Sequence, residues 1–160
     1  MQRITLSGIV VAVALASLTS FAAAEITPYY GTPVNLETAK KIAAGAMAEA
    51  RKNNWKMAVA VVDNSGMLVY YEMVDDTQTA SAGIAIDKGR TAAMWRRPSK
   101  DFEQGVADGR VALLGLSGVT PIEGGLPIVV GGKVIGGVGV SGGASAQDAQ
   151  CGRAGLDTLK

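Results

Sequence analysis

The sequence predicts an α/β (α+β) protein in which an antiparallel sheet is covered by helices on both faces. Apolar strand patterns come in two pairs, each joined by a short turn, and helical patterns precede, separate and follow these pairs. Hairpins place neighbouring strands antiparallel, and helices between them cover the faces of the sheet. Eleven of the 21 glycines lie between Gly115 and Gly143, so the second hairpin favours close backbone approach.

The amino-terminal segment has the pattern of a secretory signal. Arg3 precedes a mostly apolar run that ends in the small residues Ala22-Ala23-Ala24. The run is too short for a good membrane span, and no later segment reaches about 18 uninterrupted apolar residues. We therefore expect a signal peptide at residues 1–24, one mature domain at residues 25–160, and a periplasmic or secreted protein.

Charge and composition exclude several classes of function. Removing Arg3 from the 15 basic residues leaves 14 against 14 acidic ones, without the basic excess of a nucleic-acid-binding protein. We expect no nucleic-acid partner and, after signal cleavage, no membrane partner. Histidine is absent, which excludes Ser-His-Asp, Cys-His and His-metal mechanisms. The single Cys151 cannot build a zinc site or an internal disulfide, so we expect no metal site.

The first half of the mature chain predicts an arm, a helix and a hairpin. Residues 25–34 contain two prolines and are expected to be extended. Asn35 is expected to cap a helix whose small and apolar residues recur at helical spacing. Residues 57–62 are apolar on both faces, as in a central strand, and a turn leads to a partner strand over residues 67–73.

The second half predicts helices around the glycine-rich hairpin. Residues 81–95 form a small-residue-rich helix, Ser99 begins a short one, and a glycine-punctuated connection follows. The Gly131-Gly132 pair supplies the positive φ of a hairpin turn. The remaining expected elements are strands at 128–130, 133–135 and 136–142 and a helix at 145–159.

The segment from Gly136 to Gly142 leaves its backbone bare enough for another element or a ligand to approach. It matches G-x-G-x-x-G, but the returning strand of a dinucleotide fold does not follow, so we set that function aside. A helix beginning near Ser145 would direct free N–H groups at an anion there. Capping of that helix is the favoured role of the Ser145 and Asp148 side chains.

Five separated motifs carry a family resemblance. They are Val61-Val62-Asp63 with Gly66, Met73 with Asp75, Lys88 with Thr91-Ala92, Gly124-Gly125 with Pro127, and Gly136 to Gly142 with Asp148. In this order they resemble the GlcG/HbpS-like family, which includes the carboxyl-terminal domain of PduO-type cobalamin adenosyltransferases. The resemblance implies a profilin-like three-layer α/β/α sandwich with a five-stranded antiparallel sheet. It also implies a homo-oligomer, a tetramer or octamer, and for some members the binding of haem or a related tetrapyrrole, but no settled reaction.

The chain departs from this family at two points that concern a ligand. Where members commonly have Arg-Met-Asp, this chain has Glu72-Met73-Val74-Asp75, so an acid replaces a cation that could meet an anionic ligand. Without histidine, axial coordination of haem would fall to Met, Tyr, Lys, Cys or a weak oxygen ligand.

Lys88 is the central candidate for a site residue. It shares a helical stripe with Ile84, Thr91 and Trp95, where no charge is expected. It either pairs with a ligand carboxylate or acts as a base, or its stem packs while its head reaches water. The expected ligand-binding residues, converging on a pocket at the glycine face, are Lys88, Thr91, Asp75, Thr120, Glu123, Gly124, Gly125, Ser141 and Gly142.

Other polar residues have simpler expected roles. Asp63 and Asp75 are each expected chiefly to serve a turn, and the place of Asp75 after a strand end also allows an acid role or a salt bridge to Lys88. Arg96 and Arg97 follow a helix end and are expected to offset its dipole rather than bind substrate. Cys151 is expected to be a small buried hydrophobe.

Three functional hypotheses remain open from the sequence. The leading one is an exported protein that binds haem or another flat anionic molecule at the glycine face. The alternative is a small tautomerase-like or isomerase-like enzyme for carboxylated or carbonyl compounds, with Lys88 as acid and base and the Ser141 and Gly142 amides stabilising an enolate. In the third, the glycine face is only an interface between subunits.

Overall fold

The computed structural model describes residues 27–160, so the expected signal peptide at residues 1–24 lies outside the described residues. Within the described part, no helix is both long and apolar enough to cross a membrane. The elements, in chain order, are β1 (Tyr29–Tyr30), α1 (Leu36–Lys52), β2 (Ala58–Asp63), β3 (Leu68–Met73), α2 (Ser81–Trp95), α3 (Ser99–Ala107), the 3-10 helix η1 (Val111–Gly115), β4 (Gly125–Val130), β5 (Lys133–Ser141) and α4 (Ser145–Asp157).

The strands form one five-stranded sheet around β5. β5 pairs antiparallel with β2 and β4, and β2 pairs antiparallel with β3. The expected hairpin turn is confirmed, since Gly131 and Gly132 have φ values of 56° and 73°. The two expected strands after this turn are one continuous strand, β5.

The sheet is mixed, which corrects the expectation of a purely antiparallel one. Tyr29 and Tyr30 of the amino-terminal arm pair in parallel with Lys133 and Val134 of β5. The arm therefore contributes a two-residue strand beyond the end of β2.

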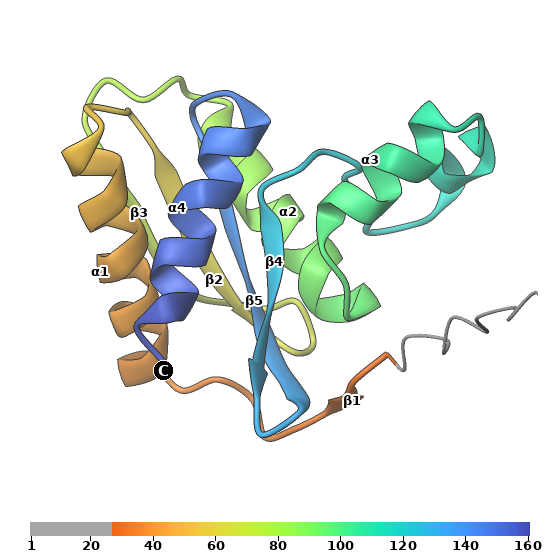
Figure 1. The fold of residues 1–160 in the computed structure, drawn as a ribbon, viewed down its shortest axis with the longest axis horizontal. Coiled ribbons are helices and arrows are strands. Elements are labelled where there is room, and N and C mark those ends of the chain that lie inside the picture. Colours follow the sequence, from red (N-terminus) through yellow and green to blue (C-terminus); the bar gives the residue numbers. More distant parts are fainter. Residues whose placement is uncertain (1–26) are drawn as a thin grey trace, which may run out of the picture.

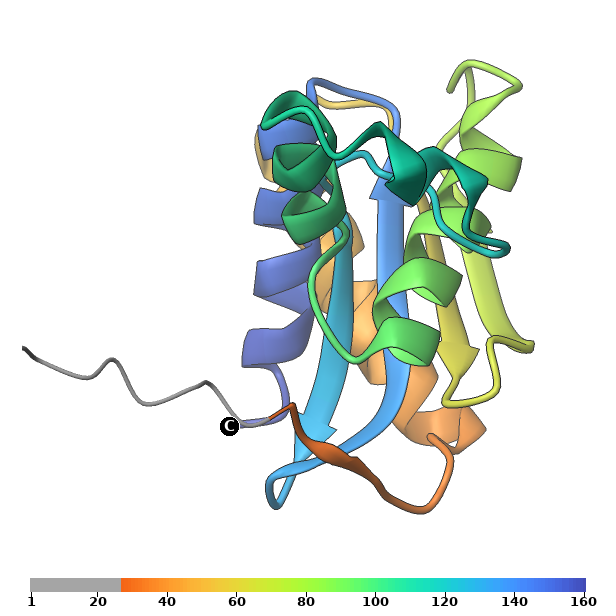
Figure 2. The same cartoon turned by 90° about the vertical axis from the view of Figure 1, so that its right-hand side faces the viewer.

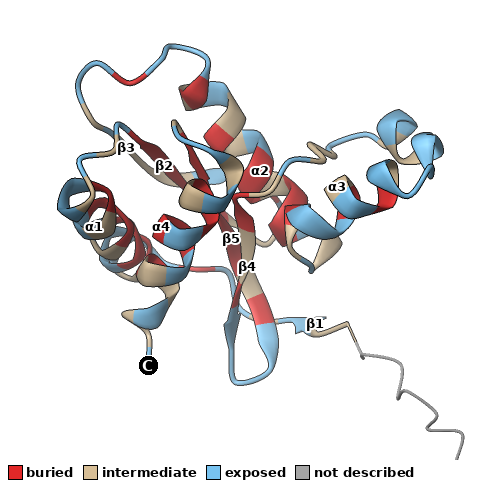
Figure 3. Ribbon diagram, turned by 45° about the horizontal axis from the view of Figure 1, so that its top comes forward, coloured by how far each residue is buried: buried red, intermediate tan, exposed pale blue. Residues whose placement is uncertain are grey.

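Helices cover both faces of this sheet, which confirms the three-layer sandwich (Figure 1). α1 and α4 pack together on one face, while α2 packs on β5, β2 and β4 from the other, as Figure 2 shows from the side. Buried residues concentrate along the strands and on the helix sides that face them (Figure 3). Asn35 caps α1 as expected, because its Oδ1 accepts a 2.9 Å bond from Thr38 N.

The glycines of β5 allow α2 to pack backbone against backbone. A Cβ at Gly139 would collide with the carbonyl oxygen of Ala85, and one at Gly137 would collide with that of Gly89. Gly89 in turn faces Gly139 N, which would lie 3.2 Å from an added Cβ. The bare backbone of β5 is therefore a surface for helix packing, which corrects the interpretation that a ligand lies flat against it.

α3 and η1 project away from the sandwich (Figure 1). They contact each other more than they contact the sheet, and α3 also packs against the end of α2 and against β4. Val111 and Leu114 on η1 are 65% and 62% exposed. This projection begins at the α2–α3 corner, where Arg96, Arg97 and Pro98 lie.

Candidate functional site

Lys88 lies on the face of α2 that packs on the sheet, and its side chain is buried. Its Nζ donates a 2.8 Å bond to Oδ2 of Asp148 on α4, and both side chains are 2% exposed. Oδ1 of Asp148 accepts from the backbone N–H of Gly143 at 3.0 Å. The pair joins helices that belong to opposite layers of the sandwich.

Gly124 makes room for this ion pair at the start of β4. A Cβ on Gly124 would lie 2.9 Å from Lys88 Nζ and 3.0 Å from Asp148 Cβ, and its φ of 130° favours glycine as well. Burial raises the pKa of Asp148, although the hydrogen bond from Lys88 opposes this rise. The low polarity around the carboxylate thus outweighs the attraction of the ammonium.

The structure decides between the roles that the sequence left open for Lys88, and it corrects the role expected of Ser145. The head of Lys88 is not solvated, and its partner is Asp148 rather than Asp75, which is exposed in the turn after β3. The side chain of Ser145 does not cap α4, because Gln147 does so by accepting from Ala144 N at 2.9 Å. Asp148 takes part in capping, as expected, only through its Oδ1, which accepts from the N–H of Gly143 just before α4.

Several of the other sequence-predicted residues fasten the chain between η1 and β4. Thr91 Oγ1 accepts from Thr120 N at 2.8 Å and donates to Asp87 O at 2.9 Å. Glu123 forms a 3.1 Å ion pair with Lys100, and its own N–H donates to Glu103. These bonds hold the segment before β4 against α2 and α3.

The remaining predicted residues are also in packed surroundings. Gly125 lies against the carbonyl of Lys88 and donates its N–H to Ser99 Oγ at 2.9 Å. Ser141 is 4% exposed and is paired with Ala58, and a Cβ at Gly142 would collide with Lys56 O. The structure brings Gly124 and Gly125 to Lys88, brings Thr120 to Thr91, and leaves Asp75 apart.

An open groove lies elsewhere, at the corner between α2 and α3. It has a volume of about 560 Å³ and adjoins the edge of β4. Cationic, polar and apolar side chains mix in its lining. The lining residues are Thr27, Pro28, Arg96, Arg97, Pro98, Asp101, Pro127 and Val129.

Arg96 is held in place at this groove. Its Nη1 donates a 3.0 Å bond to Pro28 O, and its guanidinium carbon lies 5.1 Å from the centre of the Tyr30 ring. Its φ of 55° is left-handed, at the residue that follows the last turn of α2. Glycine or asparagine adopts that conformation more cheaply than arginine.

Arg97 lines both this groove and a neighbouring hollow of about 200 Å³. Its guanidinium lies over the ring of Phe102, 5.6 Å from the centre, and Phe102 meets Trp95 edge to face. Among the described residues, neither Arg96 nor Arg97 forms an ion pair with a carboxylate. From the sequence, both arginines were expected to offset the helix dipole, and a cation at a helix end is too common to have indicated the groove.

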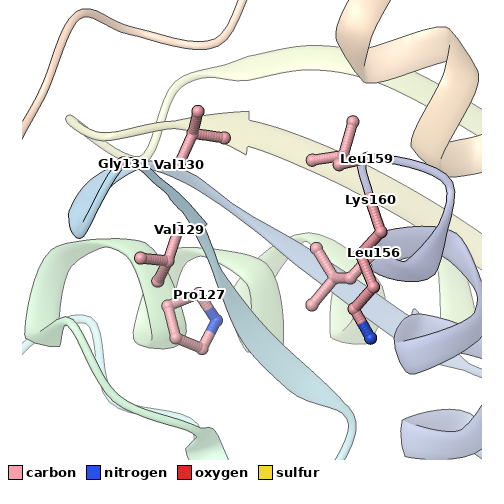
Figure 4. Close-up of a pocket in the computed structure, with 7 residues that line it drawn as sticks. All are labelled: Pro127, Val129, Val130, Gly131, Leu156, Leu159 and Lys160. Atoms are coloured by element: carbon pink, nitrogen blue, oxygen red, sulfur yellow. The ribbon is translucent and has the colours of Figure 1, made fainter.

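The other side of the β4 edge has a smaller hollow, drawn in Figure 4. It measures about 320 Å³, and Leu156 and Leu159 line it from the end of the chain. Pro127 and Val129 line this hollow as well as the groove, so the β4 edge divides the two. Its lining is mainly apolar, and Lys160 is the one charged side chain among the described residues that line it.

Comparison with known proteins places the chain in a family. Residues 34–157 match the family model described as haem degrading protein HbpS-like. The chain is 43% identical over 105 residues to Protein GlcG of Escherichia coli K12, covering 66% of this chain and 78% of that protein. The chain therefore belongs to the HbpS-like family, as the sequence motifs indicated.

Solved structures agree with this assignment. A double mutant of Streptomyces reticuli HbpS superposes with a TM-score of 0.76 at 29% identity, covering 94% of this chain and 99% of that one. A complex of PduOC with haem has a TM-score of 0.73 at 21% identity, covering 79% and 95% of the two chains. The second similarity shows a shared fold alone.

Proposed function

We propose that this protein binds haem or a related flat anionic molecule after export to the periplasm or the medium. The match of residues 34–157 to the haem-related HbpS-like family carries this proposal. The signal-like pattern of residues 1–24 supports export. We further propose a homo-oligomer, a tetramer or octamer, from the family resemblance.

The residues of the open groove suit the carboxylates and the flat faces of haem better than they suit its iron. Arg96 and Arg97 suit its carboxylates, and the prolines and Val129 suit its flat apolar faces. The described residues that line the groove include no Met, Tyr, Lys or Cys, and the chain has no histidine, so among them only Thr27 and Asp101 offer side-chain oxygens to iron. Haem would supply redox-active iron, and these residues would hold the carboxylates and the edge of its macrocycle.

Titration of the purified mature protein with haemin tests the proposal. We expect a saturable change in the haem absorption spectrum, with a stoichiometry that native mass spectrometry counts per subunit. A heat-unfolded sample provides the control for nonspecific uptake. A spectrum that changes only linearly with added haemin, together with a mass spectrum free of bound ligand, would contradict it.

The enzyme alternative gains no support from the geometry. An acid or base must reach the substrate proton within hydrogen-bonding distance. Lys88 is 2% exposed and already bonded to Asp148, and Ser141 is buried beside β2. We therefore propose binding and no reaction at Lys88.

A further inference from the structure

We propose that the groove lined by Arg96 and Arg97 binds a flat dicarboxylate of the tetrapyrrole class through its carboxylates and its plane, and not through iron. This inference rests on the proposed function, since it assigns a place and a mode of recognition to that ligand. It moves the site from the glycine face, which α2 covers, to the corner between α2 and α3.

The size and the walls of the groove suit such a ligand. Its volume of about 560 Å³ falls inside the range of roughly 300–1,000 Å³ typical of small-molecule sites. Pro28, Pro98 and, on β4, Pro127 and Val129 supply apolar surface. Proline rings are rigid, so little side-chain freedom is lost when a flat molecule packs on them.

The charge of the groove suits an anion with two acidic groups. Among the described residues of the lining, two guanidinium groups and one carboxylate, that of Asp101, give a net charge of +1. A guanidinium can hold a carboxylate by two parallel hydrogen bonds, and no described carboxylate occupies either arginine in this way. Asp101 lies between the groove and its neighbour and selects against a ligand with more negative charge at that end.

Both arginines are oriented before any ligand arrives. Pro28 O and the Tyr30 ring fix Arg96, and the Phe102 ring supports Arg97. The left-handed backbone at Arg96 costs free energy that glycine would avoid, so the side chain itself accounts for arginine at this position. Preorganised cations lose less freedom on binding than mobile ones.

Recognition without iron follows from the lining. The strong axial ligands of haem are His, Cys, Met and Tyr side chains, and none of them is among the described residues that line the groove. Carboxylates and macrocycle are the same in haemin and in metal-free protoporphyrin IX. The two molecules should therefore bind with dissociation constants within about threefold of each other.

A comparison of five variants tests the site. Arg96→Asn keeps a residue suited to the left-handed backbone, Arg97→Gln removes the second charge, and the two are combined in one double variant. Arg153→Gln is the matched control, because it removes one exposed arginine on α4 that does not line the groove. Val129→Glu places an anion on the exposed β4 edge and leaves both arginines intact.

Binding of haemin and of protoporphyrin IX is measured by quenching of tryptophan fluorescence, with circular dichroism confirming that each variant is folded. We expect the double variant and Val129→Glu to weaken both ligands at least tenfold, the control to stay within twofold, and protoporphyrin dimethyl ester to bind poorly. Binding of haemin that the groove variants leave unchanged would overturn this site while the proposed function stands. Binding of haemin without binding of protoporphyrin IX would overturn the proposal that the carboxylates and the plane of the ligand, and not its iron, are recognised. Failure of the wild-type protein to bind either ligand would overturn the proposed function itself.

Discussion

Lys88 Nζ on α2 lies 2.8 Å from Asp148 Oδ2 on α4, and this pair connects the two helical layers of the sandwich. Both side chains are 2% exposed, so each charge depends on the other for most of its stabilisation. Gly124 leaves the space that the ammonium occupies, and Gly143 N–H satisfies the second carboxylate oxygen. The charge that looks like an active-site lysine in the sequence is a structural cation in the fold.

Replacing either partner should destabilise the protein strongly. Lys88→Met leaves the buried carboxylate of Asp148 unpaired. Asp148→Asn leaves the buried ammonium of Lys88 unpaired, although the side-chain oxygen of the new asparagine can still accept from Gly143 N–H. Each change should lower the free energy of unfolding by about 3–5 kcal/mol. Urea unfolding at pH 7, followed by far-ultraviolet circular dichroism, measures the loss.

The double variant Lys88→Met with Asp148→Asn is the control for this prediction. It leaves no buried charge, so its loss should be clearly smaller than the sum of the two single losses, by about 1–3 kcal/mol. Additive losses would mean that the pair contributes nothing as a pair. Lys88→Met should also raise the pKa of Asp148 further, since Lys88 lowers that pKa in the native protein.

A methyl group at Gly139 should disrupt the packing of α2 on β5. The added Cβ would meet the backbone of Ala85 and Gly89, which cannot rotate away. We expect Gly139→Ala to lower the free energy of unfolding by about 3 kcal/mol, the upper end for overpacking. The loss should appear as a lower midpoint in urea unfolding.

Gly83→Ala in the first turn of α2 is the matched substitution. A Cβ there has no atom within 4 Å, and Gly83 is exposed, so alanine should add about 0.4–1 kcal/mol through helix propensity and a less flexible unfolded chain. Equal effects at Gly139 and Gly83 would show that α2 does not rest on the β5 backbone.

Most of the fold could be predicted because its elements have clear side-chain periodicity or turn residues. The central strand β2, the Gly131-Gly132 turn and helices α1, α2 and α4 all carry such signals. β1 was not predicted, because Tyr29 and Tyr30 pair with β5 through backbone groups and two residues are too few to show an alternation of apolar and polar side chains. The parallel pairing that makes the sheet mixed could therefore not be predicted from side-chain periodicity.

The candidate site was harder to predict for a similar reason. The stripe of α2 correctly marked Lys88 as a charge on a buried face, but its partner is 60 residues away, and no local spacing connects the two. The glycines of β5 indicated a close approach without indicating whether a ligand or a helix approaches. The groove at Arg96 depends on where the arm and β4 meet the α2–α3 corner, which only the tertiary structure shows.

Thr91 should anchor the segment before β4 more than it contributes to any ligand site. Thr91→Val keeps the shape but removes the acceptor of the Thr120 N–H and the donor to Asp87 O. We expect a loss of about 1–3 kcal/mol in the free energy of unfolding, the cost of partly buried groups left unpaired. Hydrogen exchange at the Thr120 amide should accelerate in the variant.

Thr38→Val in α1 serves as the control for this loss, because its hydroxyl forms no hydrogen bond with any described residue and the change in helix propensity is similar. It should change stability by less than about 0.5 kcal/mol. A Thr91 variant that matches this control would contradict the anchoring role.

Cys151 should be inert as a native thiol and should weaken the fold only in alkali. The residue is fully buried, and burial raises its pKa to about 11 from a usual value of 9.0. Between these two pKa values the unfolded chain has already lost the thiol proton while the native protein keeps it, so the free energy of unfolding falls as pH rises through this window. Cys151→Ala should remove that part of the slope, whereas the slope from tyrosines and lysines remains in both proteins.

Urea unfolding at pH 8, 9, 10 and 11 measures the difference, and labelling with a thiol-specific disulfide reagent at pH 8 should be slow until urea unfolds the chain. Rapid labelling of the folded protein, or parallel pH profiles for the two proteins, would show that the thiol is accessible and ordinary.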